Sequence, residues 1–159
     1  NGKANVKISQ KDANDWIRTT GELDLVYYDP PYNKHPYNIY YFLLDIISNW
    51  NTNIEIPDTY RGQPKNWIKS SYCSLKKARE TFEDLIENTN SKFIMISYNS
   101  KGIIPLDEMD EILSKKGKVE KIPFVHNTYN RYVGIAKKKR EKKEEKIKEF
   151  IWLVDCRKN

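Results

Sequence analysis

The stretch Leu23-Asp24-Leu25-Val26-Tyr27-Tyr28-Asp29-Pro30-Pro31-Tyr32 joins an apolar run to two consecutive prolines. The apolar and aromatic residues from Leu23 to Tyr28 predict a β-strand. Neither proline has an N–H group for a sheet ladder, and each keeps the residue before it extended. We therefore expect the strand to end at Tyr28 and a stiff loop to follow.

Helical and strand patterns alternate on both sides of this strand. Upstream, the alternation from Val6 to Ser9 predicts a short strand, and Asp12-Ala13 leads into a brief helix that ends near Gly21. A polar stretch from Asn49 to Tyr72, which contains Pro and Gly, predicts a long loop. Further helices are expected over 40–47, from an N-cap at Ser74 to Asn88 and over 105–116, with strands over 92–98, 119–125 and 150–154.

Strands that alternate with helices predict an α/β fold: a mostly parallel sheet flanked by helices, in which the last two strands could pair antiparallel. A chain of 159 residues with 38% hydrophobic positions suits a single domain over 1–159. Its formal net charge of +6 favours an anionic partner such as nucleic acid.

Cysteine and histidine usage gives no sign of a metal site. Cys73 and Cys156 are far apart, so neither a disulfide framework nor structural zinc is expected, and a reducing cytoplasm fits best. His35 and His126 have no cysteine or carboxylate at ligand spacing and are interpreted as surface or hydrogen-bonding residues. No apolar run approaches the roughly 18 residues that a membrane helix needs, so we expect no membrane partner.

The Asp29 to Tyr32 loop is the candidate for chemistry, because ligands of open α/β sheets bind at the C-terminal ends of strands. Methylating a nucleobase amine requires two fixed acceptors for its N–H groups. The Asp29 carboxylate and the Pro30 carbonyl could be these acceptors, held in place by the Pro30-Pro31 pair. Tyr32 could stack on a base taken out of the duplex. The alternative is a proline-rich surface turn.

The residues Leu25 to Asn33 resemble motif IV of the Dam-like (D12 class) adenine-specific DNA methyltransferases. The resemblance implies a partial Rossmann-like methyltransferase fold that uses S-adenosylmethionine as methyl donor. It implies catalytic roles for Asp29, Pro30, Pro31 and Tyr32, double-stranded DNA with a flipped adenine as substrate, and a restriction-modification system.

Other blocks of the chain are similar to the same family. The segment 5–16 is similar to the block before the motif, which implies cofactor contacts from Asp12 and Ala13 beside Asp29. The segments 37–47, 93–104 and 149–153 are similar to later blocks. The six glycines include no Phe-x-Gly-x-Gly pattern. We therefore expect the cofactor loop and target-recognition region in an upstream half or a partner subunit, and an inactive fragment without them.

Several polar and basic residues are candidates for DNA contact. Tyr60 and Trp67 are interleaved with the basic residues of the long loop, and the mixed-charge run 137–146 could also contact phosphates. The alternatives are an ordinary polar loop and a solvated charge run. The candidates are Asn33, Arg61, Lys65, Lys69, Ser70 and Ser71, with Tyr129 and Arg131, which resemble positions of a late family motif.

The sequence is also compatible with two rival functions. One is a methyltransferase for the cytosine amino group or a protein amide, since similar Pro-Pro-Tyr motifs meet the same need for two acceptors. The other is an inactive DNA-binding remnant that uses only the basic surface. Aspartate at position 29 favours adenine.

Overall fold

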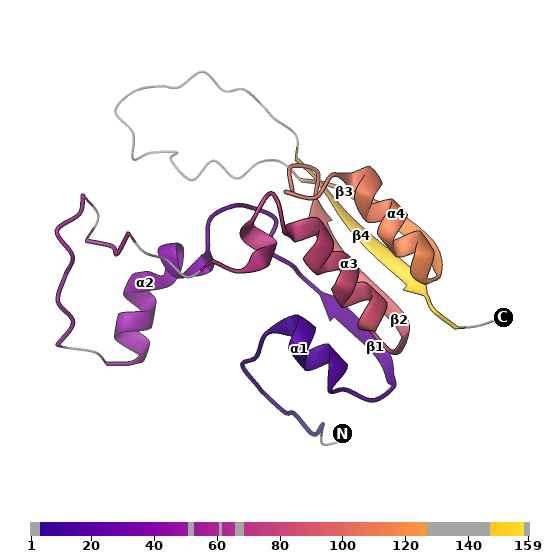
Figure 1. Cartoon of the computed structure of the whole chain (residues 1–159), viewed down its shortest axis with the longest axis horizontal. Helices are drawn as coiled ribbons and strands as arrows, with labels where there is room; N and C mark the ends of the chain where they lie inside the picture. The colour runs from indigo at the N-terminus through magenta and orange to yellow at the C-terminus, as the bar shows by residue number, and fades with distance from the viewer. Residues whose placement is uncertain (1–3, 51–52, 61, 66–68, 127–146, 158–159) are drawn as a thin grey trace.

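A four-stranded sheet in the order β1-β2-β4-β3 organises the chain (Figure 1). The computed structural model describes residues 4–50, 53–60, 62–65, 69–126 and 147–157. The strands are β1 (Leu23–Tyr28), β2 (Ser91–Asn99), β3 (Lys118–His126) and β4 (Ile147–Asp155). All four lie where the sequence predicted strands, and β1 ends at Tyr28, directly before Asp29.

The expected mostly parallel sheet is wrong. Strand β1 pairs parallel with β2, but β4 lies between β2 and β3 and pairs antiparallel with both. The antiparallel pairing of the last two strands, which the sequence left open, is confirmed. Parallel neighbours need a long crossover connection, such as the one between β1 and β2, whereas antiparallel neighbours can be joined by a short or a long one.

The predicted helices are present, but α2 begins three residues earlier than expected and α3 begins later. They are α1 (Ala13–Arg18), α2 (Tyr37–Ser48), α3 (Ala78–Asn88) and α4 (Leu106–Lys116), with a 3-10 turn η1 over Ser71–Cys73. Helix α3 begins at Ala78 and not after Ser74, because a separate turn comes first, in which the Ser74 carbonyl accepts the N–H groups of Lys77 and Ala78 at 3.2 and 2.9 Å. Helix α4 begins after Pro105 and ends at Gly117, as predicted.

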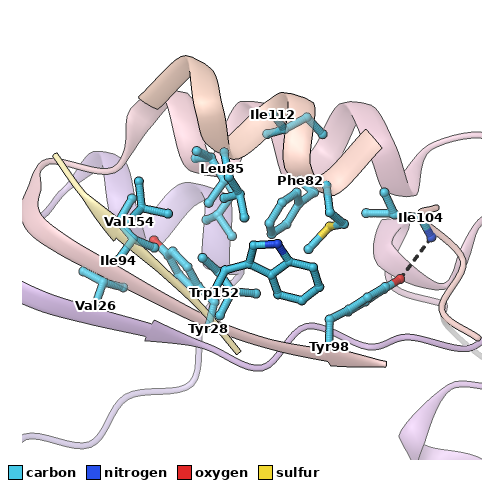
Figure 2. Packing of buried hydrophobic residues seen from close by; sticks show 14 of the residues in the cluster. Val26, Tyr28, Phe82, Leu85, Ile94, Tyr98, Ile104, Ile112, Trp152 and Val154 are labelled. Carbon is cyan, nitrogen blue, oxygen red and sulfur yellow. Dashed lines mark hydrogen bonds between the residues drawn. The ribbon is translucent and has the colours of Figure 1, made fainter. Parts of the chain in front are cut away.

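The core lies between one face of the sheet and helices α1, α3 and α4. Figure 2 shows Trp152 of β4 at its centre, between the side chains of α3 and α4 and those of β1 and β2. Phe82 of α3 and Ile112 of α4 reach this centre from the helices. These side chains are fully buried, so the spacing of apolar residues along α3 and α4 explains which faces the helices turn inward.

The opposite face of the sheet, here called the outer face, is not covered by the described part of the chain. Leu25 and Tyr27 are 52% and 53% exposed there. Helix α2 stands apart from the sheet and has no buried residue among those described. By strand register and alternation, the outer face includes Leu25, Tyr27, Phe93, Met95, Ser97, Ile122, Phe124, Ile151 and Leu153, together with the charged Glu120 and Glu149.

The strand expected from Val6 to Ser9 is wrong. Residues 4–12 form neither helix nor strand, and Val6 and Ile8 are 79% and 90% exposed. An alternating segment becomes a strand only when a neighbouring edge accepts its hydrogen bonds, and the described sheet pairs β1 with β2 alone. Among the described residues, no helix is long and apolar enough to cross a membrane.

Candidate active site at the ends of strands β1 and β2

The Asp-Pro-Pro-Tyr loop begins directly after β1, at the C-terminal end of a strand that pairs parallel with its neighbour. Pro30 is buried and Pro31 is half-buried, so the prolines anchor the loop. Asp29 is exposed, and Tyr32 is 38% exposed. The predicted catalytic side chains of Asp29 and Tyr32 are thus accessible to a ligand. The two prolines, which were expected to make the loop rigid, are packed against the protein.

Residues of β2 and the turn after it hold this loop at two points. The Ser97 hydroxyl donates to Asp29 Oδ1 at 3.0 Å. The Ile103 N–H donates to the Tyr32 carbonyl oxygen at 3.0 Å. The turn is held in its own place by Tyr98, whose hydroxyl accepts the Ile104 N–H at 3.0 Å (Figure 2).

Asp29 and Tyr32 line one pocket of about 500 Å³. The pocket opens beside the outer face, where β2, β3 and β4 contribute the opposite wall. Its volume lies within the range of small-molecule and cofactor sites. The lining consists of Tyr27, Asp29, Tyr32, Ser97, Tyr98, Asn99, Phe124, Glu149, Phe150 and Ile151.

Aromatic rings and carboxylates define the chemistry of this pocket. Asp29 and Glu149 are carboxylates, and the described lining contains no lysine or arginine. Burial raises the pKa of Tyr37, at the start of α2, and the negative charge of Asp29 raises it further. The lining favours a flat ligand with hydrogen-bond donors or positive charge.

The predicted cofactor residues Asp12 and Ala13 lie at the start of α1. Asp12 Oδ1 caps this helix by accepting the N–H groups of Asn14 and Asp15 at 2.9 and 3.3 Å. Neither Asp12 nor Ala13 is among the residues that line the pocket. Helix capping accounts for the aspartate, and its cofactor role stays a prediction.

The described DNA-binding candidates lie outside the pocket lining. Asn33 Oδ1 accepts the His35 N–H at 2.9 Å, which shapes the loop after the motif. Lys65 and Lys69 are exposed, and Ser70 caps η1 by accepting the Tyr72 N–H. Outside the described residues lie Arg61, Trp67, Tyr129, Arg131 and the run 137–146.

Sequence reasoning missed several pocket residues. Ser97 and Asn99 were included only in the resembling segment 93–104, and Tyr27 only in the predicted strand and the resembling motif. Phe124 and Glu149 lie at the near ends of β3 and β4, and they reach the pocket because β4 is inserted beside β2. The alternation of β2 could have indicated Ser97, a polar residue on the same face as Phe93 and Met95.

The candidate site is thus a carboxylate-bearing loop at the C-terminal end of β1, beside a pocket that several aromatic rings line. Comparison with known proteins then indicates which class of protein the chain is similar to. The chain is 30% identical over 151 residues to the type II methyltransferase M.FokI of Planomicrobium okeanokoites, a match that covers 93% of this chain and 22% of that protein.

Two other relatives are also named as methyltransferases or methylases. The chain is 28% identical over 151 residues to the type II methyltransferase M.NlaIII of Neisseria lactamica, covering 94% of the chain and 42% of the relative. It is 35% identical over 133 residues to the modification methylase StsI of Streptococcus sanguinis, covering 78% and 19%. The chain thus spans less than half the length of each of these relatives. A scan against protein families finds no match, and no solved structure matches.

These similarities support the methyltransferase expectation drawn from the sequence. Similarity to proteins with this name extends over most of the chain, well beyond the Asp-Pro-Pro-Tyr loop. The names of the relatives do not state which base is methylated, so the Dam-like class and the adenine target stay predictions.

Proposed function

We propose that this chain forms the catalytic part of an adenine-specific DNA methyltransferase of the Dam-like (D12) class, from a restriction-modification system. The observation that carries the proposal is the Asp29-Pro30-Pro31-Tyr32 loop, fixed after β1 with Asp29 and Tyr32 lining one pocket. A flipped adenine in double-stranded DNA is the proposed substrate.

The loop offers the two acceptors that an exocyclic amine requires. Within the described part of the chain, neither Asp29 Oδ2 nor the Pro30 carbonyl oxygen accepts a hydrogen bond, whereas Asp29 Oδ1 does. Both oxygens can therefore accept the amine N–H groups and direct the nitrogen lone pair out of conjugation with the ring. Fixed acceptors favour the transition state because they need no reorganisation when it forms.

Tyr32 and Asp29 complete the proposed chemistry. The partly exposed Tyr32 ring stacks on the flipped base, which offsets some of the cost of unstacking it. When bound, the donor would supply a methyl group to the amine nitrogen, and its sulfur–carbon bond would be the bond that breaks. The displaced amine proton then passes to the Asp29 carboxylate.

The residues present fit S-adenosylmethionine, which supplies an electrophilic methyl group on a positively charged sulfur. The carboxylates of the lining favour the positive charge, and its aromatic rings favour a flat purine. Asp29 and Tyr32 are the residues we expect beside the reacting end. Further cofactor contacts come from Asp12 and Ala13 and from a glycine-rich loop that this sequence does not contain.

The test is transfer of radiolabelled methyl groups from S-adenosylmethionine to mixed-sequence DNA by the full-length protein, followed by identification of the modified base. Asp29→Ala should lower the rate at least about a hundredfold, the usual loss when one fixed polar group of an active site is removed. The matched control is Asp24→Ala, which removes an exposed carboxylate that pairs with Lys92 near the other end of β1.

The product and the variants separate the rival functions. Methyladenine formed by the wild type and by Asp24→Ala, but not by Asp29→Ala, supports the proposal. Methylcytosine would replace the adenine target with the cytosine amine. No transfer to DNA by the wild type would overturn the proposal and favour a DNA-binding remnant.

A further inference from the structure

We infer that Ser97 is a positioning residue for Asp29, and that Tyr27 sets the direction of the Ser97 hydroxyl; this inference rests on the proposed function. The three side chains form a hydrogen-bonded chain that crosses from β1 to β2 and back. Tyr27 Oη lies 2.8 Å from Ser97 Oγ, and Ser97 Oγ lies 3.0 Å from Asp29 Oδ1.

The chemistry of the groups fixes the direction of this chain. An ionised carboxylate only accepts hydrogen bonds, so Ser97 must donate its single hydroxyl proton to Asp29. The Ser97 oxygen can then only accept from Tyr27, which must donate. Because Tyr27 occupies a lone pair of this oxygen, it favours the rotamer in which the serine proton points at Asp29. The hydrogen bonds from Tyr27 to Ser97 and from Ser97 to Asp29 therefore have a single arrangement of protons.

The position of Ser97 in β2 explains why its hydroxyl can hold Asp29 in a fixed orientation. Strands β1 and β2 pair parallel up to Tyr28 and Ile96, and Asp29 and Ser97 are the next residues of the two segments. Ser97 also pairs with Ile151 of β4, so the ladder on that side still holds it. Asp29 has left the ladder and has no comparable support from its own strand. Strand β2 thus orients the carboxylate of Asp29, although Asp29 itself belongs to the loop after β1.

The contact leaves Asp29 ready for substrate. Ser97 binds Oδ1, and within the described residues Oδ2 accepts no hydrogen bond. Holding one oxygen fixes the plane of the carboxylate, and the second oxygen then has a defined direction toward the pocket that Asp29, Ser97 and Tyr27 all line. Small displacements of a reacting group slow a reaction strongly, so the loss of this hydrogen bond should lower kcat.

A merely structural role for the Ser97 hydroxyl is disfavoured by its surroundings. Ser97 lies on the outer face, where it is half-buried, and it contributes no side chain to the core. The β2 ladder is made by backbone groups, which alanine keeps. Ser97→Ala should therefore fold normally while losing the contact to Asp29.

The experiment measures kcat and KM for DNA methylation by the full-length protein and four variants. Ser97→Ala should lower kcat about tenfold to a hundredfold with little change in KM for DNA, because orientation is lost while binding groups remain. Ser97→Thr keeps the hydroxyl and should restore most of the turnover. Tyr27→Phe should lower kcat by a smaller factor. Ser114→Ala, which removes an exposed hydroxyl from α4, is the matched control.

The outcomes separate this inference from the proposed function. Wild-type turnover in Ser97→Ala would overturn the inference and leave the proposed function standing. An equal loss in Ser97→Ala, Ser97→Thr and Ser114→Ala would also overturn it, because the loss would then not follow the hydroxyl. If Ser97→Ala fails to fold by circular dichroism, unchanged turnover in Tyr27→Phe overturns the inference and reduced turnover supports it. A wild type without methyl transfer overturns both proposals.

Discussion

At the residue scale, Gly102 allows the Tyr98 ring to lie under the turn that holds Tyr32. A Cβ atom at position 102 would lie 2.0 Å from Tyr98 Cε1 and 2.3 Å from Cζ. The ring is buried, and its hydroxyl accepts the Ile104 N–H, so it has little freedom to move aside. Gly102→Ala should therefore destabilise the protein by about 1–3 kcal/mol, as overpacking commonly does.

Urea denaturation of wild type and Gly102→Ala measures this loss. Gly21→Ala is the control, because a Cβ atom there meets nothing within 4 Å, and the substitution should be neutral or slightly stabilising. Equal midpoints for the two alanine variants would show that the Tyr98 ring does not constrain the turn.

At the element scale, Asp110 of α4 joins the helix to two strands. Its Oδ1 accepts Trp152 Nε1 at 2.6 Å, and its Oδ2 accepts Lys121 Nζ at 2.7 Å. Trp152 is fully buried, so removing the acceptor leaves an indole N–H without a partner. Asp110→Ala should lower the free energy of unfolding by about 1–3 kcal/mol. Asp110→Asn, which keeps one carbonyl oxygen, should lose less.

Asp107→Ala is the control for that measurement, since it removes an exposed carboxylate from the first turn of the same helix. Thermal or urea unfolding of the three variants ranks their stabilities. A larger loss in Asp107→Ala than in Asp110→Ala would mean that the helix dipole, and not the Trp152 contact, dominates.

A second element-scale contact makes the packing of α1 on α3 sensitive to acid. The Asp84 carboxylate of α3 accepts hydrogen bonds from Asn14 at 2.6 Å and from Arg18 at 2.5 Å, and these contacts lower the pKa of Asp84 below its usual 3.8. The unfolded chain therefore takes up the proton first as the pH falls. The stabilisation is complete above pH 3.8 and is lost as the pH falls through the lower folded-state value.

Comparison of wild type with Asp84→Asn tests this dependence. The difference in their free energies of unfolding should be constant from pH 7 to pH 5 and should shrink below about pH 4. Urea denaturation at each pH measures it. A difference that persists unchanged at pH 3 would show that the ionised carboxylate is not what stabilises the contact.

At the scale of the whole molecule, the sequence predicted elements better than their arrangement. Local signals fixed β1, α4 and the rigid loop, since Pro30, Pro105 and Gly117 act within one or two residues of themselves. Strand direction and order depend on partners far along the chain, so the insertion of β4 beside β2 was not predicted. For the same reason the local Asp-Pro-Pro-Tyr motif could be predicted, whereas the hydrogen bond from Ser97 to Asp29, which joins residues far apart in the sequence, could not.

The outer face predicts how the isolated 159-residue chain behaves in solution. Leu25, Tyr27, Ile122 and Phe124 are between 38% and 53% exposed on one surface, and contiguous apolar patches promote association. We expect the chain to self-associate through this face at raised concentration and to bind the dye ANS. Leu25→Lys combined with Ile122→Lys should weaken both effects, because burying the new charges in an interface is costly.

Sedimentation velocity over a concentration series, with ANS fluorescence on the same samples, measures this behaviour. Leu75→Lys is the control, since Leu75 is 77% exposed but lies outside the outer face, and it should associate like the wild type. A monomeric wild type without ANS binding would contradict the prediction. So would equal weakening by Leu75→Lys, because total surface hydrophobicity, and not this face, would then drive association.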